Sequence, residues 1–348
     1  MKRKDYRKSR TSKKRTALKI IATLVASLLV CVSAYGIFLV KKAENAANQA
    51  FEEADNRTMS DLREEQVEPL HDNVSVLFIG VDDSEKRDQD DDNIRSDALV
   101  LATLNNEDKS VKLVSIPRDT YTYIPDAGYE DKITHAYGYN GPSSTIESVE
   151  GLLEVPVDYY VRMDFEAFID IVDALDGIEA EVPYDLSEKD ENDVHNAIVL
   201  EEGLQTLNGR EALALARTRH YDNDIQRGKR QQMLIESIMD EILSASSITK
   251  YGDVIDAIGD NMKTNLSFKD MQSFFEYAKG GSPEVETITL DGYDDMSTGV
   301  YYWQLHEESL MEIQDVLQSH LGLKPDTSTL TDSSEIDFSE QKASERGY

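Results

Sequence analysis

Three apolar stretches lie close together early in the chain, and each has the length and composition of a β-strand. They are Val74–Val81, Ala98–Leu104 and Val111–Ile116. Near-continuous runs of Val, Leu and Ile are typical of strands that are buried on both faces. The polar residues Asn105–Asp108 separate the last two stretches, so we expect these two to form a hairpin. The acidic segment 84–93 separates the first two and is too polar for a core.

Farther along, apolar residues recur with the period of an α-helix, interrupted by short apolar runs. The predicted helices are Ser143–Leu153, Phe165–Leu175, 208–218, Gln226–Leu243, Phe268–Lys279 and Gln304–Leu321, and the predicted strands are Val157–Met163, Ile178–Val182 and Glu284–Leu290. Asn208 and Ser267 stand where N-caps belong. This alternation predicts an α/β fold with a mixed central β-sheet sandwiched by helices, whose apolar side chains we expect in the core. The alternative is that a fraction of those on 143–153, 165–175 and 231–243 line a pocket for a lipid tail.

The N-terminal region has the pattern of a membrane anchor. Residues 1–15 carry nine Lys or Arg and one acid, and Ile20–Val40 is a run of 21 uncharged residues, long enough to cross a bilayer. Basic residues that flank a membrane span stay in the cytoplasm. We therefore expect residues 1–19 in the cytoplasm, residues 20–40 as a single pass through the cell membrane, and the C-terminal domain outside the cell. A signal peptide cleaved after Ala34 is the alternative; the apolar residues that continue to Val40 favour an uncleaved anchor.

A polar segment precedes a single large domain, and another follows it. Alanines recur at helical spacing in 41–70, which indicates a helical stalk that either self-associates or is a solvated linker, with the linker favoured. Residues 324–348 are acidic and poor in apolar side chains, so we expect a disordered tail. The catalytic domain is expected at 71–323.

Charge and cysteine content exclude several functions. The net charge is −32, and residues 41–348 hold 26 basic and 67 acidic side chains, a formal −41. Such a surface repels nucleic acid. Cys31 is the only cysteine and lies in the predicted span, so thiol chemistry and disulfides are not expected outside. The six histidines lack zinc-ligand spacing, and neither a P-loop nor a nucleophile elbow is present.

Against this acidic background, arginines recur beside carboxylates in short motifs. These are Arg95-Ser96-Asp97, Pro117-Arg118-Asp119, Arg217-Thr218-Arg219 and Asp224-Ile225-Gln226-Arg227. Guanidinium groups bind phosphate in a bidentate manner, and carboxylates can hold a Mg²⁺ ion that shares the phosphate oxygens. The pattern predicts a phosphate and metal site, with Asp82 and Asp97 as metal ligands and Lys132 as a further phosphate contact. The alternatives are that both aspartates are turn residues at strand ends and that Lys132 is a loop cation.

Arg217 and Arg219 give the sharpest signal. A helix turns by about 100° per residue, so two side chains that are two residues apart point in different directions on it. Both can contact one phosphate group only if the backbone becomes extended. We therefore expect the helix to end by about Ala216, with both arginines directed into one cavity with Arg118 and Asp97.

Taken together and in order, these motifs resemble the LytR–CpsA–Psr family of membrane-anchored cell-wall enzymes. The matching segments are Leu77–Asp82, Arg95–Asp97, Ser115–Thr120, Asp131–Ala136, Val157–Val161, Gly203–Ala212, Ala216–Arg219 and Asp224–Gln232. The chain departs from the family pattern in its long acidic segment after Asp82 and in lacking a glycine before Arg227.

The resemblance implies a phosphotransferase that attaches an undecaprenyl-pyrophosphate-linked glycopolymer to peptidoglycan through a phosphodiester. Mg²⁺ would be bound by Asp82 and Asp97, and the pyrophosphate by Arg95, Arg118, Arg217, Arg219 and Arg227. Either Asp82 or Asp119 would take the acceptor proton, and the two remain alternatives. The competing class is a membrane-tethered receptor that binds polyprenyl phosphates without turnover. The polymer, whether teichoic acid, capsule or another wall polysaccharide, is not identified by the sequence.

Overall fold

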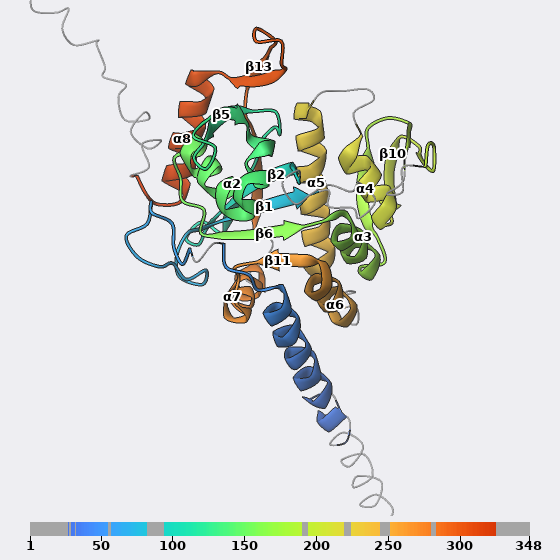
Figure 1. Cartoon of the computed structure of the whole chain (residues 1–348). Coiled ribbons are helices and arrows are strands. Elements are labelled where there is room, and N and C mark those ends of the chain that lie inside the picture. Colours follow the sequence, from blue (N-terminus) through green and yellow to red (C-terminus); the bar gives the residue numbers. More distant parts are fainter. Residues whose placement is uncertain are drawn as a thin grey trace, which may run out of the picture.

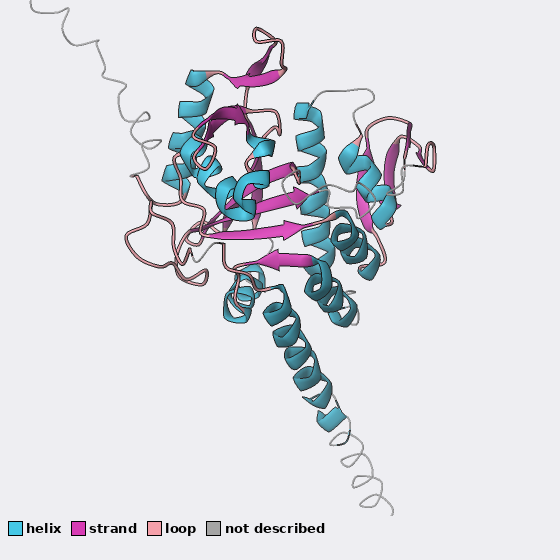
Figure 2. Cartoon of the chain, in the orientation of Figure 1, coloured by secondary structure: helices cyan, strands magenta, loops and turns pink. Residues whose placement is uncertain are grey.

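The computed structural model describes residues 27, 29–31, 33–54, 57–81, 94–189, 194–218, 224–243, 251–279 and 283–324. A six-stranded mixed sheet runs through its centre, in the order β11–β6–β1–β2–β3–β12. Helices cover both faces of the sheet (Figures 1 and 2). The predicted α/β sandwich is therefore confirmed.

The first three apolar stretches form the middle of this sheet. They are β1 (Val74–Val81), β2 (Ser96–Asn105) and β3 (Ser110–Ser115), which pair as antiparallel neighbours. Parallel pairing adds β6 (Tyr159–Met163) beside β1 and β12 (Glu284–Thr289) beside β3. The short β11 (Met262–Thr264) closes the other edge. The predicted hairpin is confirmed.

The two faces of the sheet pack against different helices because side chains alternate along each strand. Leu77 and Ile79 share a core with α2 (Tyr137–Leu153) and α8 (Glu307–His320). On the opposite face, Val100 and Leu113 pack toward α5 (Asp224–Leu243), and Val76 packs toward α7 (Phe268–Lys279). The final helix begins at Glu307, not at Gln304 as predicted, because Tyr302–Leu305 form the strand β14.

A second core lies beside the sheet. It is built by α3 (Phe165–Ala174), α4 (Gly209–Arg217), α5 and α6 (Tyr251–Asn261), with β7 (Ile178–Val182) paired to β10 (Gly203–Leu207). The short pair β8 (Leu186–Glu188) and β9 (Ile198–Leu200) completes it. Because α5 contributes to both cores, it forms one wall of the space between them.

Two further hairpins were not predicted from the sequence. Strands β4 (Tyr121–Ile124) and β5 (Tyr129–Lys132) form one, and β13 (Gly292–Asp295) and β14 form the other. Their side chains are mixed tyrosines and acids, so they lack the apolar alternation that marks a half-buried strand. A bridge between Thr120 and Trp303 joins the two hairpins.

The alanine stripe packs on the domain and does not form a solvated linker. A helix covers residues 33–50, and Ala47 and Ala50 are buried. Ala46 lies against Gly259 of α6, and Lys42 Nζ is 2.7 Å from Asp256 Oδ2. Figure 1 shows this helix at the lower end of the molecule, beside α6 and α7.

Part of the predicted membrane span falls outside the described residues. Of this span, residues 20–26, 28 and 32 are not described. The basic segment 1–19 and the predicted tail from 325 onward also lie outside the described residues. Within the described segments, no helix combines the length and apolar character that a membrane crossing requires.

Candidate functional site

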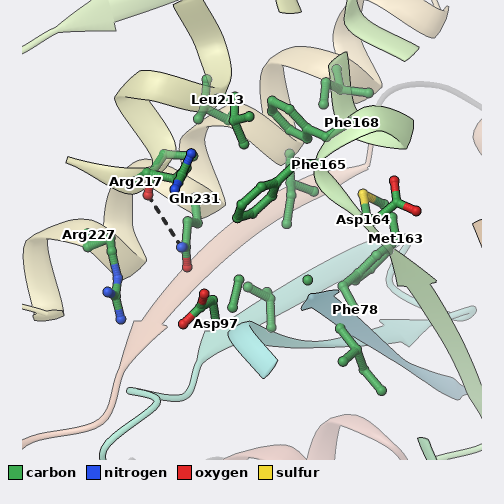
Figure 3. A pocket seen from close by; sticks show the side chains of 18 of the residues that line it. Phe78, Asp97, Met163, Asp164, Phe165, Phe168, Leu213, Arg217, Arg227 and Gln231 are labelled. Atoms are coloured by element: carbon green, nitrogen blue, oxygen red, sulfur yellow. Dashed lines mark hydrogen bonds between the residues drawn. The ribbon is translucent and has the colours of Figure 1, made fainter. Parts of the chain in front are cut away.

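A deep cavity opens between the sheet and helices α3, α4 and α5. Its volume is about 500 Å³. Most of its lining is apolar, and Figure 3 shows Phe78 of β1, Met163 at the end of β6 and Phe165 and Phe168 of α3 around it. On the sheet side, Gly80 lies opposite Ala98, where a Cβ on the glycine would be 3.1 Å from the Ala98 Cβ. Both small residues line the cavity.

One end of the cavity is charged. Asp97, Arg118, Arg217 and Arg227 line it, and each was predicted from the sequence as a site residue. They come from β2, from the segment after β3, from the end of α4 and from the first turn of α5. Figure 3 shows Asp97, Arg217 and Arg227 together at this end. The cavity therefore combines an apolar body with a cationic end that also holds a carboxylate.

Ion pairs organise this charged end. Arg118 Nη1 lies 2.5 Å from Asp97 Oδ1, and its Nε lies 3.6 Å from Asp119 Oδ2. Asp119 is nearly buried, and its other oxygen accepts from Lys132 Nζ at 2.8 Å. Neither Lys132 nor Asp119 lines the cavity; Asp119 links Lys132 to Arg118, which does. Asp97 and Asp119 hold Arg118 from two sides, so its position is fixed before any ligand binds.

Local structure also places Arg217. A capping box begins α4, in which Asn208 and Glu211 accept each other's backbone N–H groups. The helix ends at Arg217, one residue later than predicted, and Thr218 has an extended backbone. Buried Arg230 donates from Nε to the Leu215 carbonyl and from Nη2 to that of Thr218, which satisfies carbonyl groups at this helix end.

The Arg217 guanidinium lies 4.4 Å above the centroid of the Phe165 ring. This cation–π contact holds the planar group at the boundary between the apolar and charged parts of the cavity. Arg219 lies outside the described residues, so the prediction that it shares this cavity stays a prediction.

Arg227 is buried on the first turns of α5. The next residue, Gly228, allows the helix to approach the sheet closely, since a Cβ there would lie 2.4 Å from Ser115 Oγ. Gln232 anchors the same helix by donating from Nε2 to the Leu113 carbonyl at 2.8 Å. The glycine that the family pattern often places before this arginine is absent, but the glycine after it serves a packing role.

Three described residues of the predicted site do not line the cavity: Arg95, Asp119 and Lys132. Arg95 is exposed and does not line it. Asp82 lies outside the described residues, so its role as a metal ligand or base stays a prediction. Among the side chains that the structure describes, no group of three or more His, Cys, Asp or Glu is arranged to hold a metal ion.

Sequence reasoning did not identify which apolar residues form the cavity wall. It favoured the core for the side chains of α3 and α5 and left a pocket as the alternative; Phe165, Phe168 and Ile238 line the cavity. A signal was present in α5, where Arg227, Gln231, Leu234, Ile238 and Ile242 follow helical spacing on one face, and all line the cavity. A stripe that begins with Arg and Gln is unusual for a core face.

Gln231 and Asp164 are the other polar residues of the wall that were missed. Gln231 Nε2 lies 3.5 Å from the Ala216 carbonyl, which links α5 to the end of α4 (Figure 3). Asp164 caps α3 by accepting from the Ala167 N–H at 2.8 Å. The role of Gln231 depends on the neighbouring helix α4, whereas an Asp directly before a helix is a local N-cap signal.

Comparisons with known proteins agree with this geometry. TagT of Bacillus subtilis, a polyisoprenyl-teichoic acid–peptidoglycan teichoic acid transferase, is 39% identical over 324 residues, which cover 93% of this chain and 100% of TagT. The structure of TagT bound to LIIa-WTA is 40% identical with a TM-score of 0.67 and covers 77% of this chain and 98% of that one. The structure of TagT with bound octaprenyl pyrophosphate lipid is 37% identical with a TM-score of 0.63. The match covers 78% of this chain and 99% of that one.

A sequence profile of the LytR_cpsA_psr family matches residues 37–319, which include all of the cavity and both hairpins. The predicted resemblance is confirmed: the chain belongs to the LytR_cpsA_psr family.

Proposed function

We propose that this protein is a glycopolymer phosphotransferase, which moves a glycan from an undecaprenyl-pyrophosphate carrier to peptidoglycan. The observation that supports this most is the cavity itself. Its apolar body suits a polyprenyl chain, and Arg118, Arg217 and Arg227 at its end suit the pyrophosphate of the same molecule. The relatives agree, because TagT is a teichoic acid transferase by name and its structure holds octaprenyl pyrophosphate.

The proposed reaction needs charge neutralisation more than a covalent intermediate. The acceptor hydroxyl oxygen attacks the phosphorus that carries the glycan and forms a new O–P bond. The bond from that phosphorus to the bridging oxygen breaks, undecaprenyl phosphate leaves, and the hydroxyl proton passes to a carboxylate. Asp119, which lies beside Arg118, would take this proton, and Asp82 is the alternative base. The product is a phosphodiester.

Mg²⁺ is the proposed cofactor. Asp97 provides one carboxylate at the phosphate end of the cavity, and its side chain remains one-third exposed. This donor set fits Mg²⁺, which commonly takes one or two carboxylates and completes its coordination with phosphate oxygens and water. Asp97 and Asp82 would hold it. When bound, the ion would neutralise charge on the transferred phosphate.

We also propose the cell membrane as its location, with a single N-terminal anchor, a cytoplasmic N-terminus and an extracellular domain. The basic segment 1–15 and the uncharged run Ile20–Val40 support this topology. Peptidoglycan and a lipid-linked donor would then be reached on the same side of the membrane.

Turnover distinguishes the transferase from a receptor that only binds the lipid. Full-length protein in detergent is incubated with a lipid-linked glycan, peptidoglycan oligomers and Mg²⁺, and the released polyprenyl phosphate and the conjugate are quantified. We expect Asp97→Asn to reduce turnover about 100-fold and to weaken Mn²⁺ binding measured by paramagnetic resonance. Asp240→Asn, on the exposed side of α5, is the control and should leave both unchanged. Tight donor binding without any turnover by the wild type would favour the receptor.

A further inference from the structure

A group of tyrosines lies outside the cavity, on the hairpin β4–β5, at the start of β14 and in the first turn of α2. We call it the tyrosine platform; its members are Tyr121, Tyr129, Tyr139, Tyr301 and Tyr302. The Tyr121 and Tyr302 rings pack edge to face with their centroids 4.9 Å apart. The hydroxyls of Tyr129 and Tyr139 are 2.5 Å apart, and these rings are 52% and 46% exposed. Such exposure of clustered aromatic side chains indicates a binding surface.

The platform is joined directly to the charged end of the cavity. Lys132 Nζ is 2.8 Å from Asp119 Oδ1 and also lies 5.6 Å and 5.9 Å from the ring centroids of Tyr301 and Tyr302. The backbone N–H of Trp303 donates to the backbone carbonyl of Asp119 at 2.9 Å. Asp119 thus stands between Arg118, which lines the cavity, and the platform.

Polar groups beside the rings match the hydroxyls and amides of a saccharide. Asp131 accepts from Tyr302 at 3.3 Å and lies 2.8 Å from His135 Nδ1. Tyr121 donates to Glu130 at 3.1 Å, and Tyr301 donates to Asp294 at 2.8 Å. Aromatic faces that pack on apolar C–H surfaces, flanked by carboxylates that accept hydroxyl protons, form a suitable site for sugar rings.

We infer that the tyrosine platform binds the glycan strand of the peptidoglycan acceptor and presents its hydroxyl to Asp119. This inference rests on the proposed function. The charge on the platform selects the acceptor over the donor polymer: Glu130, Asp131 and Asp294 repel a chain of phosphates but accept hydrogen bonds from sugars and amides. Asp119 contacts Arg118 of the cavity through Oδ2 and Lys132 beside the platform through Oδ1, so the two sites meet at this carboxylate.

Steady-state kinetics of the full-length protein test this. Substrates are a lipid-linked glycan and a soluble peptidoglycan oligomer of alternating N-acetylglucosamine and N-acetylmuramic acid with peptide stems. We expect Tyr302→Leu and Tyr139→Ala each to raise KM for the oligomer about tenfold, with KM for the lipid donor unchanged. Tyr293→Ala is the matched control, because Tyr293 is equally exposed on β13 but contacts His306 and not the platform. It should leave both KM values unchanged.

Direct binding separates failure of this inference from failure of the proposed function. The same oligomer, titrated calorimetrically without donor, should bind the wild type and bind Tyr139→Ala about tenfold more weakly. Loss of binding in the variants supports the platform even if the wild type transfers nothing. A wild type that turns over while both variants keep the oligomer KM unchanged overturns it. A raised KM for the lipid donor alone also overturns it, because the platform would then hold the donor glycan.

Discussion

The Arg217 guanidinium is held by its shape as well as its charge. It stacks on the Phe165 ring, and its planar fork is presented to the charged end of the cavity. Lysine keeps the charge but loses both the stacking and the bidentate geometry. We therefore expect Arg217→Lys to lower kcat/KM for glycan transfer by roughly 10- to 100-fold, equivalent to about 1.4–2.7 kcal/mol. The unfolding temperature should stay unchanged.

Arg210→Lys is the control, since Arg210 lies on the exposed side of the same helix. It should transfer at the wild-type rate. If Arg217→Lys also transfers at that rate, charge alone is sufficient, and the role assigned to the planar group is wrong.

His320 is a buried histidine whose protonation opposes folding. Its ring nitrogens lie 2.8 Å from Thr103 Oγ1 and 2.9 Å from Ser110 Oγ. Burial, with a smaller effect of the Lys112 charge, lowers the pKa of His320 to about 4, although Asp108 and Glu286 act in the opposite direction. The neutral ring is therefore the form that the fold accommodates.

This lowered pKa makes stability depend on pH. The unfolded chain takes up the proton near pH 6.5 and the folded chain only near pH 4, so acidification across that window favours unfolding. We expect the free energy of unfolding to fall by at most about 3 kcal/mol from this group, with no further change below pH 4. Denaturant titrations at pH 7 and pH 4 should show a smaller loss in His320→Gln than in the wild type. The exposed His306→Gln is the control, and equal losses in all three proteins would contradict the prediction.

At the scale of elements, the approach of α5 to β3 depends on Gly228. Alanine is normally better than glycine inside a helix by up to about 1 kcal/mol. Here its Cβ would lie 2.4 Å from Ser115 Oγ, so the helix or the strand must move. We expect Gly228→Ala to lower the free energy of unfolding by about 1–3 kcal/mol and to reduce turnover, because Arg227 moves with the helix.

The matched control is Gly151→Ala, in the exposed part of α2, where no atom lies within 4 Å of the added Cβ. It should be neutral or slightly stabilising. Restoration of stability in the double variant Gly228→Ala/Ser115→Gly would identify the contact with Ser115 as the cause. A Gly228→Ala protein as stable as Gly151→Ala would disprove the close-packing argument.

At the scale of the whole molecule, the N-terminal helix joins the predicted anchor to the domain without a free spacer. Ala46 packs on Gly259, and Lys42 pairs with Asp256 of α6. We expect the domain to lie outside the cell, close to the membrane surface. Protease added to intact, wall-stripped cells should degrade the domain and leave a short N-terminal fragment. Complete protection while the membrane is intact, followed by digestion after lysis, would place the domain inside.

The strands and helices with strong apolar periodicity were predictable because their pattern follows from local burial. β1 and α7 begin and end where the sequence predicts. The hairpins β4–β5 and β13–β14 were missed because tyrosines and acids mark neither face as buried. The alanine stripe of 41–70 was assigned to a solvated linker, since small side chains do not reveal whether they face water or another helix.

The sequence by itself determined the family and the α/β class, because ordered Arg and Asp motifs mark the family without coordinates. From the same motifs it also predicted a phosphate-binding site. Tertiary structure decided which motifs meet. Arg118, Arg217 and Arg227 converge with Asp97 on one cavity, whereas Arg95 stays exposed. It also decided that apolar side chains of α3 and α5 line a cavity and are not fully packed in a core. The physical reason is that hydrophobicity drives burial in either place, while open space depends on how distant elements, with small residues such as Gly80 and Ala98, fit together.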